Sequence, residues 1–219
     1  MKTVAAVHTA APMIESTKKL FAEILPDVRL INITDDSLIQ DIINNEKIPT
    51  HVVKRLIDYY AAGFSAGADI VFNTCSSVGE IADLAQFYFE KPIIKIDDAM
   101  TEEAVANAES IGVLATLTST MNPTIRLLEK KAMQVEKKIN IVKGLAEGAF
   151  QALISGDAEK HDQIIVATAQ IITEQVDLII LAQGSMARME STLTSITGKP
   201  VISSPRRGVF QIKNALNKI

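Results

Sequence analysis

The sequence has no tryptophan, a single cysteine and few aromatic residues of any kind. Aromatic residues make up only 5% of the chain, so its core must be built from Ile, Leu, Val and Ala. One cysteine cannot form an internal disulfide, which is typical of proteins from a reducing compartment. The cytoplasm is therefore the expected location.

Long apolar runs and blocks of like charge are also absent. The first residues, MKTVAAVHTAAPMIE, have too short an apolar run for a signal peptide, and no stretch is long enough to span a membrane. The 22 basic and 26 acidic residues give a net charge of -4 with no long run of one sign, which argues against a nucleic-acid partner. A small anionic substrate stays compatible with this balance, because a binding site can be locally positive.

Cofactor motifs are missing as well. The segment after the first predicted strand, HTAAPM, lacks the glycines of a phosphate-binding loop, so neither NAD nor ATP is expected. No group of His, Cys and Asp residues has the spacing of metal ligands. We therefore expect no metal and no other cofactor.

What the sequence does contain is an alternation of short apolar runs with longer amphipathic segments. Several runs are continuously apolar, as in parallel strands that are buried on both faces. Helical stripes such as Val52, Leu56 and Tyr60 fill the gaps, so the chain is expected to be α/β with parallel sheets. The eight predicted strands are Thr3–His8, Val28–Ile33, Ile70–Asn73, Pro92–Ile96, Ile111–Ala115, Ile139–Val142, Leu178–Ala182 and Pro200–Ser203.

The two halves of the chain align at a constant offset of 108 residues. The matching segments are Ile31-Asn32-Ile33 with Ile139-Asn140-Ile141, Asp69 with Asp177, and Lys91-Pro92 with Lys199-Pro200. These identities fall at matching strands and need no gap. They favour an internal duplication over a chance likeness of two α/β stretches.

A duplication predicts two pseudo-symmetric lobes, each a parallel four-stranded sheet flanked by helices, with a cleft between them. The first lobe is expected over residues 1–97 and the second over 98–219, while the amphipathic last helix after residue 205 can pack on either lobe. Ligands bind beyond the carboxyl ends of parallel strands, so the loops after the strands are the candidate site.

The third predicted strand ends in the polar turn Asn73-Thr74-Cys75-Ser76-Ser77. Ser77 and Glu80 have the spacing of a capping box, which predicts a helix from Val78 and places Cys75 just before its N-terminus. Free NH groups there favour an anion and should lower the pKa of a thiol. Buried cysteines are often inert, but this one follows the strand instead of lying in it. Ser77 is expected to be a helix cap first.

Polar residues follow other strands too. His8 ends the first strand, and its counterpart at the 108-residue offset is Thr116, in a hydroxyl-rich turn that includes Thr118. Such a turn before a helix suits a carboxylate, although capping is the alternative. His8 could orient a carboxylate or share a proton, or simply be hydrogen-bonded. His51 and His161 are expected to be solvated on helices.

Three arginines and one loop each have more than one possible role. Arg188 is expected to pair with Glu190 or another acid, with an anionic ligand as the alternative. Arg206 and Arg207 follow the last strand and could face the cleft or another subunit. The polar stretch from Asp35 to Glu46 is a candidate lid.

Three segments together resemble the aspartate/glutamate/hydantoin racemase superfamily. They are FNTCSS at 72–77, IGVLAT at 111–116 and LIILAQGSMA at 178–187, and the resemblance covers essentially the whole chain. It implies an enzyme without a cofactor, in which one cysteine removes the proton α to a carboxylate and a second reprotonates the opposite face. Hydroxyl and backbone NH groups would hold the carboxylate, and a homodimer is usual in such families.

The sequence departs from this pattern at Gln183, where the resemblance places the second cysteine. The 108-residue offset from Cys75 leads to the same residue, and a glutamine cannot carry a proton near neutral pH. Members of the superfamily with one reactive cysteine include a decarboxylase.

We therefore expect a racemase-like isomerase that acts at the carbon α to a carboxylate of a small amino acid or diacid, with Cys75 as acid/base. The alternatives are a one-cysteine decarboxylase or cis–trans isomerase of a small diacid, a non-catalytic carboxylate-binding protein, and a module in which the cysteine is structural. The expected substrate-binding residues are His8, Asn73, Thr74, Ser76, Thr116, Thr118, Gln183, Gly184 and Ser185.

Overall fold

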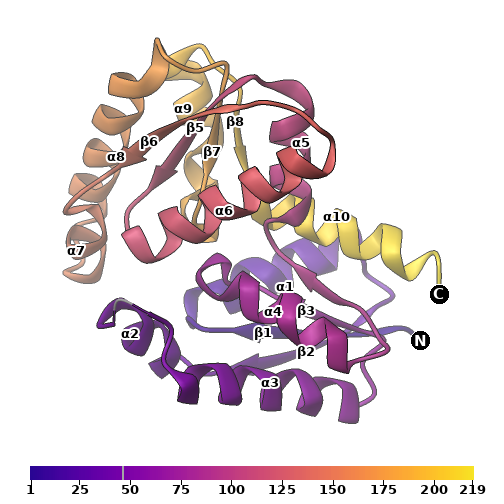
Figure 1. The fold of residues 1–219 in the computed structure, drawn as a ribbon. Coiled ribbons are helices and arrows are strands. Elements are labelled where there is room, and N and C mark those ends of the chain that lie inside the picture. Colours follow the sequence, from indigo (N-terminus) through magenta and orange to yellow (C-terminus); the bar gives the residue numbers. More distant parts are fainter. Residues whose placement is uncertain (46) are drawn as a thin grey trace. The chain divides into compact units, whose positions relative to one another are not determined.

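The computed structural model describes residues 1–45 and 47–219, and the chain divides into two compact units. The first unit comprises Met1–Ile96 and Pro205–Ile219, and the second comprises Asp97–Ser204 (Figure 1). Each contains a parallel four-stranded sheet, with strand order β2-β1-β3-β4 in the first and β6-β5-β7-β8 in the second. The predicted α/β fold with two similar lobes is therefore confirmed.

The first unit alternates strands and helices along residues 1–96, and the last helix of the chain joins it. Its elements are β1 (Thr3–His8), α1 (Pro12–Ile24), β2 (Arg29–Thr34), α2 (Ser37–Ile43), α3 (Thr50–Ser65), β3 (Ile70–Asn73), η1 (Ser76–Val78), α4 (Gly79–Ala85), η2 (Gln86–Tyr88), β4 (Ile93–Lys95) and α10 (Ser204–Leu216).

The second unit repeats the same order of strands. Its elements are α5 (Asp98–Asn107), β5 (Ser110–Ala115), α6 (Thr118–Gln134), β6 (Asn140–Leu145), α7 (Ala149–Ile154), α8 (Ala158–Thr173), β7 (Leu178–Leu181), η3 (Gly184–Met189), α9 (Glu190–Thr197) and β8 (Val201–Ser203). No helix within residues 1–45 or 47–219 combines the length and the apolar character needed to cross a bilayer.

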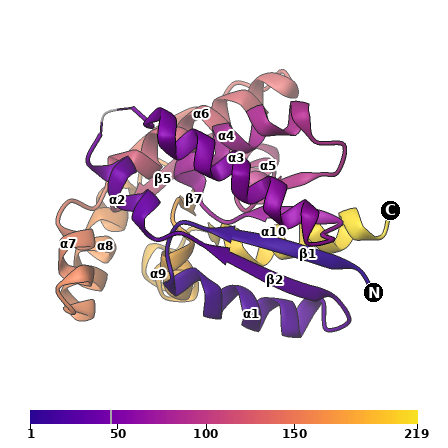
Figure 2. The same ribbon diagram turned by 90° about the horizontal axis from the view of Figure 1, so that it is seen from below.

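Both faces of the first sheet are covered by helices. One face packs against α1 and α10 through residues such as Phe21 and Ile212, and the other packs against α3 and α4 through Leu56 and Ile81. Figure 2 shows α1 and α3 on opposite sides of β1 and β2. This two-sided cover explains why β1 and β3 are apolar at every position except their ends.

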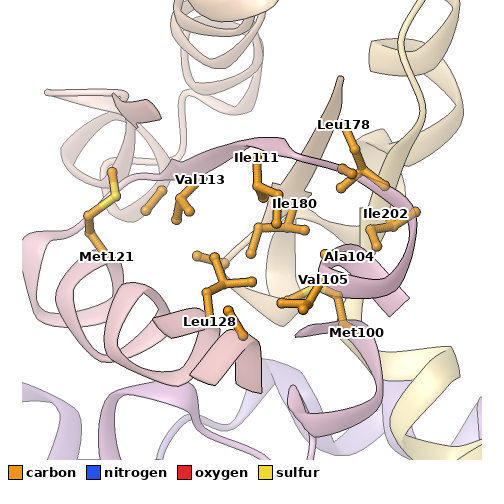
Figure 3. Packing of buried hydrophobic residues seen from close by; sticks show 14 residues of the cluster. Met100, Ala104, Val105, Ile111, Val113, Met121, Leu128, Leu178, Ile180 and Ile202 are labelled. Atoms are coloured by element: carbon orange, nitrogen blue, oxygen red, sulfur yellow. The ribbon is translucent and has the colours of Figure 1, made fainter. Parts of the chain in front are cut away.

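The second sheet is covered in the same way. Figure 3 shows Met100 of α5 and Leu128 of α6 packed against Ile111 and Ile180 on one face. Residues of α8 and α9 cover the other face, with Ile165 and Leu193 among the buried side chains. The carboxyl ends of β3 and β7 thus emerge from closely packed layers, which fixes the start of the turns that follow them.

Strand register corrects the predicted alignment of the two halves. Thr3 pairs with Arg29 in β1 and β2, while Ser110 pairs with Asn140 in β5 and β6. β3 and β4 match β7 and β8 at an offset of 108 residues, but β1 matches β5 at 107 and β2 matches β6 at 111. The gap-free alignment and the Ile-Asn-Ile match were wrong, because the loops between these elements differ in length.

The two aspartates of the repeat do correspond. Asp69 accepts a hydrogen bond from the Thr3 N–H, at 2.8 Å, and Asp177 accepts one from the Ser110 N–H, also at 2.8 Å. Each carboxylate therefore ties the start of the third strand of its sheet to the start of the first. For Asp177, bonds from the Ser110 and Glu109 backbones lower the pKa of the carboxyl.

Candidate active site

Cys75 lies two residues beyond the end of β3, at the head of the 3₁₀ turn η1. Its carbonyl accepts hydrogen bonds from the Val78 N–H, at 3.3 Å, and from Asn73 Nδ2, at 3.0 Å. The side chain is half-buried, and it is the only thiol of the protein. The turn therefore presents one potentially ionisable sulfur at the carboxyl edge of the first sheet.

The helix that follows Cys75 begins one residue later than predicted. α4 starts at Gly79, and Val78, not Ser77, occupies its N-cap position. The 3₁₀ turn closed by the Val78 N–H precedes the helix. Ser77 itself is buried.

A buried chain of polar groups lies on one side of the Cys75 turn. His8 has no exposed surface; its Nδ1 lies 2.9 Å from Thr74 Oγ1, and its Nε2 lies 2.9 Å from Asn32 Oδ1. Burial lowers the pKa of His8, although the Asn32 bond opposes the shift, so the ring is neutral near pH 7. The Thr74 hydroxyl donates its single proton to the Val7 carbonyl, at 2.9 Å, so this chain of polar groups also ties the turn to the end of β1.

A second buried chain lies between α3 and the same turn. The Tyr60 hydroxyl donates to Asn73 Oδ1, at 3.1 Å, and Asn73 Nδ2 donates to the Cys75 carbonyl. Neither Tyr60 nor Asn73 has exposed surface. Both functional groups of the Asn73 amide are therefore engaged inside the protein.

An ion pair at the end of β4 completes this side of the first unit. Lys95 pairs in register with Asn73, only 4% of its surface is exposed, and its Nζ lies 2.8 Å from the Asp83 carboxylate of α4. This pair attaches α4 to β4. Lys95 was not among the predicted residues, although a lysine at the end of an apolar strand is visible in the sequence.

Gln183 occupies the same structural position in the second unit as Cys75 does in the first. It heads η3, and the Met186 N–H donates to its carbonyl at 3.0 Å, as Val78 does to Cys75. The backbone angles are also alike, with φ and ψ of -115° and 131° for Gln183 and of -127° and 114° for Cys75. The two turns are thus structural counterparts.

The Gln183 side chain is hydrogen-bonded to Thr116. Gln183 Nε2 donates to Thr116 Oγ1 and the Thr116 N–H donates to Gln183 Oε1, both at 2.7 Å. The shared register makes Thr9 the counterpart of Thr116, and Ala115 the counterpart of His8. The predicted equivalence of His8 and Thr116 was therefore wrong by one residue.

The remaining predicted substrate-binding residues differ in exposure. Ser76 is buried, Gly184 is half-buried, and Thr118 and Ser185 are exposed. In sequence they flank the two counterpart turns, Ser76 within η1 and Gly184 and Ser185 within η3, while Thr118 begins α6. Hydroxyl and backbone NH groups are thus present near both turns.

Arg188 pairs with an acid, as predicted, and the acid is Asp162 of α8. The guanidinium makes two bonds to the carboxylate, at 2.6 and 2.5 Å, and Asp162 Oδ1 also lies 2.7 Å from His161 Nδ1. Only 2% of the His161 surface is exposed, so its predicted solvation was wrong. Arg206 pairs with Glu23 of α1.

The polar segment after β2 is held to α3. Asp35 accepts bonds from Ser37, Arg55 and the Tyr59 hydroxyl, the last at 2.6 Å, and α2 follows it. The last residue of the predicted lid, Glu46, lies outside the described residues. Within residues 1–45 and 47–219, no group of three or more His, Cys, Asp or Glu side chains could hold a metal ion.

Comparisons with known proteins agree with this architecture. The sequence model of the Asp/Glu/Hydantoin racemase family matches residues 4–211. Allantoin racemase from Klebsiella pneumoniae is similar in structure, with a TM-score of 0.74, 16% identity and coverage of 99% of this chain and 88% of the other. A glutamate racemase from Bacillus anthracis has a TM-score of 0.75, 14% identity and coverage of 99% and 82%.

A third similar structure is the Gly74Cys mutant of arylmalonate decarboxylase, with a TM-score of 0.63, 13% identity and coverage of 97% of this chain and 92% of the other. No curated protein matches the chain significantly in sequence. The family match spans nearly the whole chain and both sheets. Solved structures similar to this chain include allantoin and glutamate racemases, which are isomerases. The protein therefore belongs to the Asp/Glu/hydantoin racemase family.

Proposed function

We propose that the chain is a cofactor-independent enzyme of this family that acts at the carbon α to a carboxylate, with Cys75 as its only acid/base. The observation that supports this proposal is the contrast between two counterpart turns. One carries the single thiol of the protein, and the other carries a glutamine that is hydrogen-bonded to Thr116. A thiol can exchange a proton near neutral pH, whereas a carboxamide cannot.

In the proposed reaction the Cys75 thiolate removes the proton from the α carbon, and the electron pair of that C–H bond moves into the neighbouring carboxylate. The thiol then returns a proton from the same side, either to the α carbon, which exchanges its hydrogen with solvent, or to another carbon of an unsaturated substrate's delocalised anion, which gives an alkene isomer. The substrate carboxylate is held by the hydroxyl and NH groups of Thr116, Thr118, Ser76, Gly184 and Ser185, with Gln183 as a neutral donor. The buried Thr74 and His8 hold the turn from the interior.

A lyase is the second candidate. The likeness to an arylmalonate decarboxylase favours it, since that fold supports loss of a carboxylate as well as racemisation. In this version CO₂ leaves with cleavage of the C–C bond, the electron pair remains on the α carbon and its other carboxylate, and the Cys75 thiol protonates that carbon. A single proton donor is sufficient for this reaction, while two-sided racemisation calls for a second one.

Selective alkylation tests the proposal directly, because Cys75 is the only residue that iodoacetamide can label at a thiol. We expect fast labelling of the native protein, measured by intact mass, and slower labelling with malonate, maleate, aspartate or glutamate. The amide ligands acetamide and succinamide serve as uncharged controls. Labelling at the rate of a free thiol peptide, unaffected by every carboxylate, would contradict the proposal.

Turnover separates an enzyme from a non-catalytic binder. Each carboxylate that slows labelling is incubated with the protein in heavy water and its α position is followed by proton NMR. Exchange of that proton, or release of CO₂, identifies an enzyme and its reaction. Binding without either change would instead identify a carboxylate-binding protein and overturn the catalytic assignment of Cys75.

A further inference from the structure

A buried tyrosine–asparagine pair supports the Cys75 turn, and the counterpart turn lacks such a pair. Tyr60 and Asn73 lie between α3 and the Cys75 carbonyl, without exposed surface. In the second unit, Leu181 stands where Asn73 stands, and the order of buried positions along α8 puts Ala169 at the place of Tyr60. Leu181 and Ala169 belong to one apolar cluster.

The duplication therefore acts as an internal comparison. The same fold forms the Gln183 turn with apolar side chains at these positions, so neither the strand nor the turn needs a hydroxyl or an amide there. Buried polar groups cost stability unless every one is bonded. Their restriction to the thiol side indicates a role connected with Cys75.

We infer that Tyr60 is a positioning residue for Cys75, acting through Asn73. The inference rests on the proposed role of Cys75. The Tyr60 hydroxyl fixes the Asn73 amide, and that amide holds the Cys75 carbonyl together with the Val78 N–H. With the carbonyl held by two donors, the backbone angles of Cys75 are confined and the direction of its Cα–Cβ bond is set.

The surroundings of Tyr60 suit such a role. α3 approaches β1 closely, since a Cβ on Gly63 would lie only 2.8 Å from Cβ of Ala5. Tyr60 thus belongs to a helix that is packed too closely against β1 to shift freely toward it. Burial, and then the charge of a Cys75 thiolate, raise the pKa of Tyr60, so its hydroxyl stays protonated and donates at every working pH.

The test uses protein labelled with ¹³C at the cysteine β carbon, which gives one resonance because there is one cysteine. Tyr60→Phe keeps the ring and removes the hydroxyl. We expect a single narrow resonance in the parent, and a broadened or doubled one in Tyr60→Phe with a changed titration between pH 6 and 9. Tyr59→Phe, which removes the neighbouring hydroxyl bonded to Asp35, is the matched control and should match the parent.

Asn73→Leu tests whether the hydroxyl acts through the amide, and it copies the residue that the second unit carries at Leu181. We expect its cysteine spectrum to be altered, and the Tyr60→Phe/Asn73→Leu double variant to match Asn73→Leu alone. Dispersed amide spectra show that each variant is folded. A parent-like cysteine resonance in Tyr60→Phe, or effects of the two changes that simply add, would overturn the inference.

These outcomes are independent of catalysis. If no carboxylate shifts the cysteine resonance of the parent and none is turned over, the proposed function fails. The comparison of Tyr60→Phe with Tyr59→Phe still decides whether Tyr60 positions the thiol.

Discussion

At the scale of single residues, Cys75 is the group on which the proposed chemistry depends. Cys75→Ala should leave the fold intact, because the side chain is half-buried in a turn and its backbone angles are open to alanine. Turnover should fall by about 10²–10⁴-fold, as for the loss of a positioned acid/base. The checks are a thermal unfolding curve and the rate of the α-proton exchange.

Two results would contradict this prediction. A Cys75→Ala protein that does not fold would make the thiol structural. A variant with near-parent turnover would move the base to another residue, and His8 is then the wrong first choice, because its ring is buried and both nitrogens have partners.

Thr116 carries a second prediction at this scale. Its hydroxyl accepts a hydrogen bond from the Gln183 amide, so Thr116→Val removes that bond and leaves Gln183 bonded only to the backbone N–H of residue 116. We expect carboxylate binding to weaken by about 1–3 kcal/mol, the usual effect of unpairing a group that bonds a charge. Calorimetric titration of the best carboxylate measures the change. Thr194→Val, on the exposed side of α9, is the control and should bind like the parent.

At the scale of elements, the segment between β2 and α3 is held by one half-buried carboxylate, that of Asp35. Burial opposes ionisation of Asp35, but bonds from Tyr59 and Ser37 and the charge of Arg55 outweigh it and lower its pKa below the ordinary 3.8. A lowered pKa stabilises the fold at pH values above 3.8, and the effect is lost as the pH falls through the folded value.

Asp35→Asn should therefore lower the free energy of unfolding by about 1–2 kcal/mol at pH 7. The difference from the parent should shrink in acid, where the parent carboxylate becomes protonated as well. Urea unfolding at pH 7 and pH 3 measures both values, and the exposed neighbour Asp36→Asn should match the parent. An equal loss at the two pH values would show that the charge of Asp35 contributes nothing.

Elements also show what the sequence could and could not predict. All eight strands were predicted, since continuous apolar runs are typical of strands buried on both faces. The alignment of β2 with β6 failed, because loops change length freely while isoleucine-rich strands look alike. The helix after Cys75 begins one residue later than predicted, because a 3₁₀ turn over Ser76–Val78 precedes it.

The candidate site, too, could be predicted only in part from the sequence. Cys75 and Gln183 could be recognised as counterparts because β3 and β7 keep one offset through the turn. Tyr60 could not be found, because a tyrosine in an apolar stripe is ordinary core until its hydroxyl partner is known. The Gln183 bond to Thr116 was equally hidden, since it joins residues 67 positions apart.

At the scale of the whole molecule, duplication has produced two similar sheets whose counterpart turns differ in chemistry. The positions around Cys75 are polar and bonded, with His8, Thr74 and Asn73, whereas their counterparts Ala115, Ala182 and Leu181 are apolar. The two units are thus alike in fold but differ in the polar residues around their counterpart turns. A reaction that needs a proton-transferring group at both turns does not fit this distribution of residues.

The last prediction follows from that asymmetry. Inversion at carbon without a cofactor needs a proton acceptor on one face and a donor on the other, and the counterpart of Cys75 is a carboxamide. We therefore expect one-sided chemistry: in heavy water, deuterium should enter one face of the product, which should be a single enantiomer or an alkene isomer. Chiral chromatography and NMR of the product measure both properties.

Gln183→Cys supplies the missing donor and is the matched variant. Its thiol would lie on the same backbone conformation as Cys75, so it should add racemisation that the parent lacks. Gln183→Ser shortens the side chain without adding a group that ionises near neutral pH, so it should not add racemisation. Comparable rates of L-to-D and D-to-L conversion of aspartate or glutamate by the parent protein would refute the idea. A second proton carrier would then have to exist, and water held by Thr116 or Thr118 would be the first candidate, because both hydroxyls flank the turn that Gln183 closes.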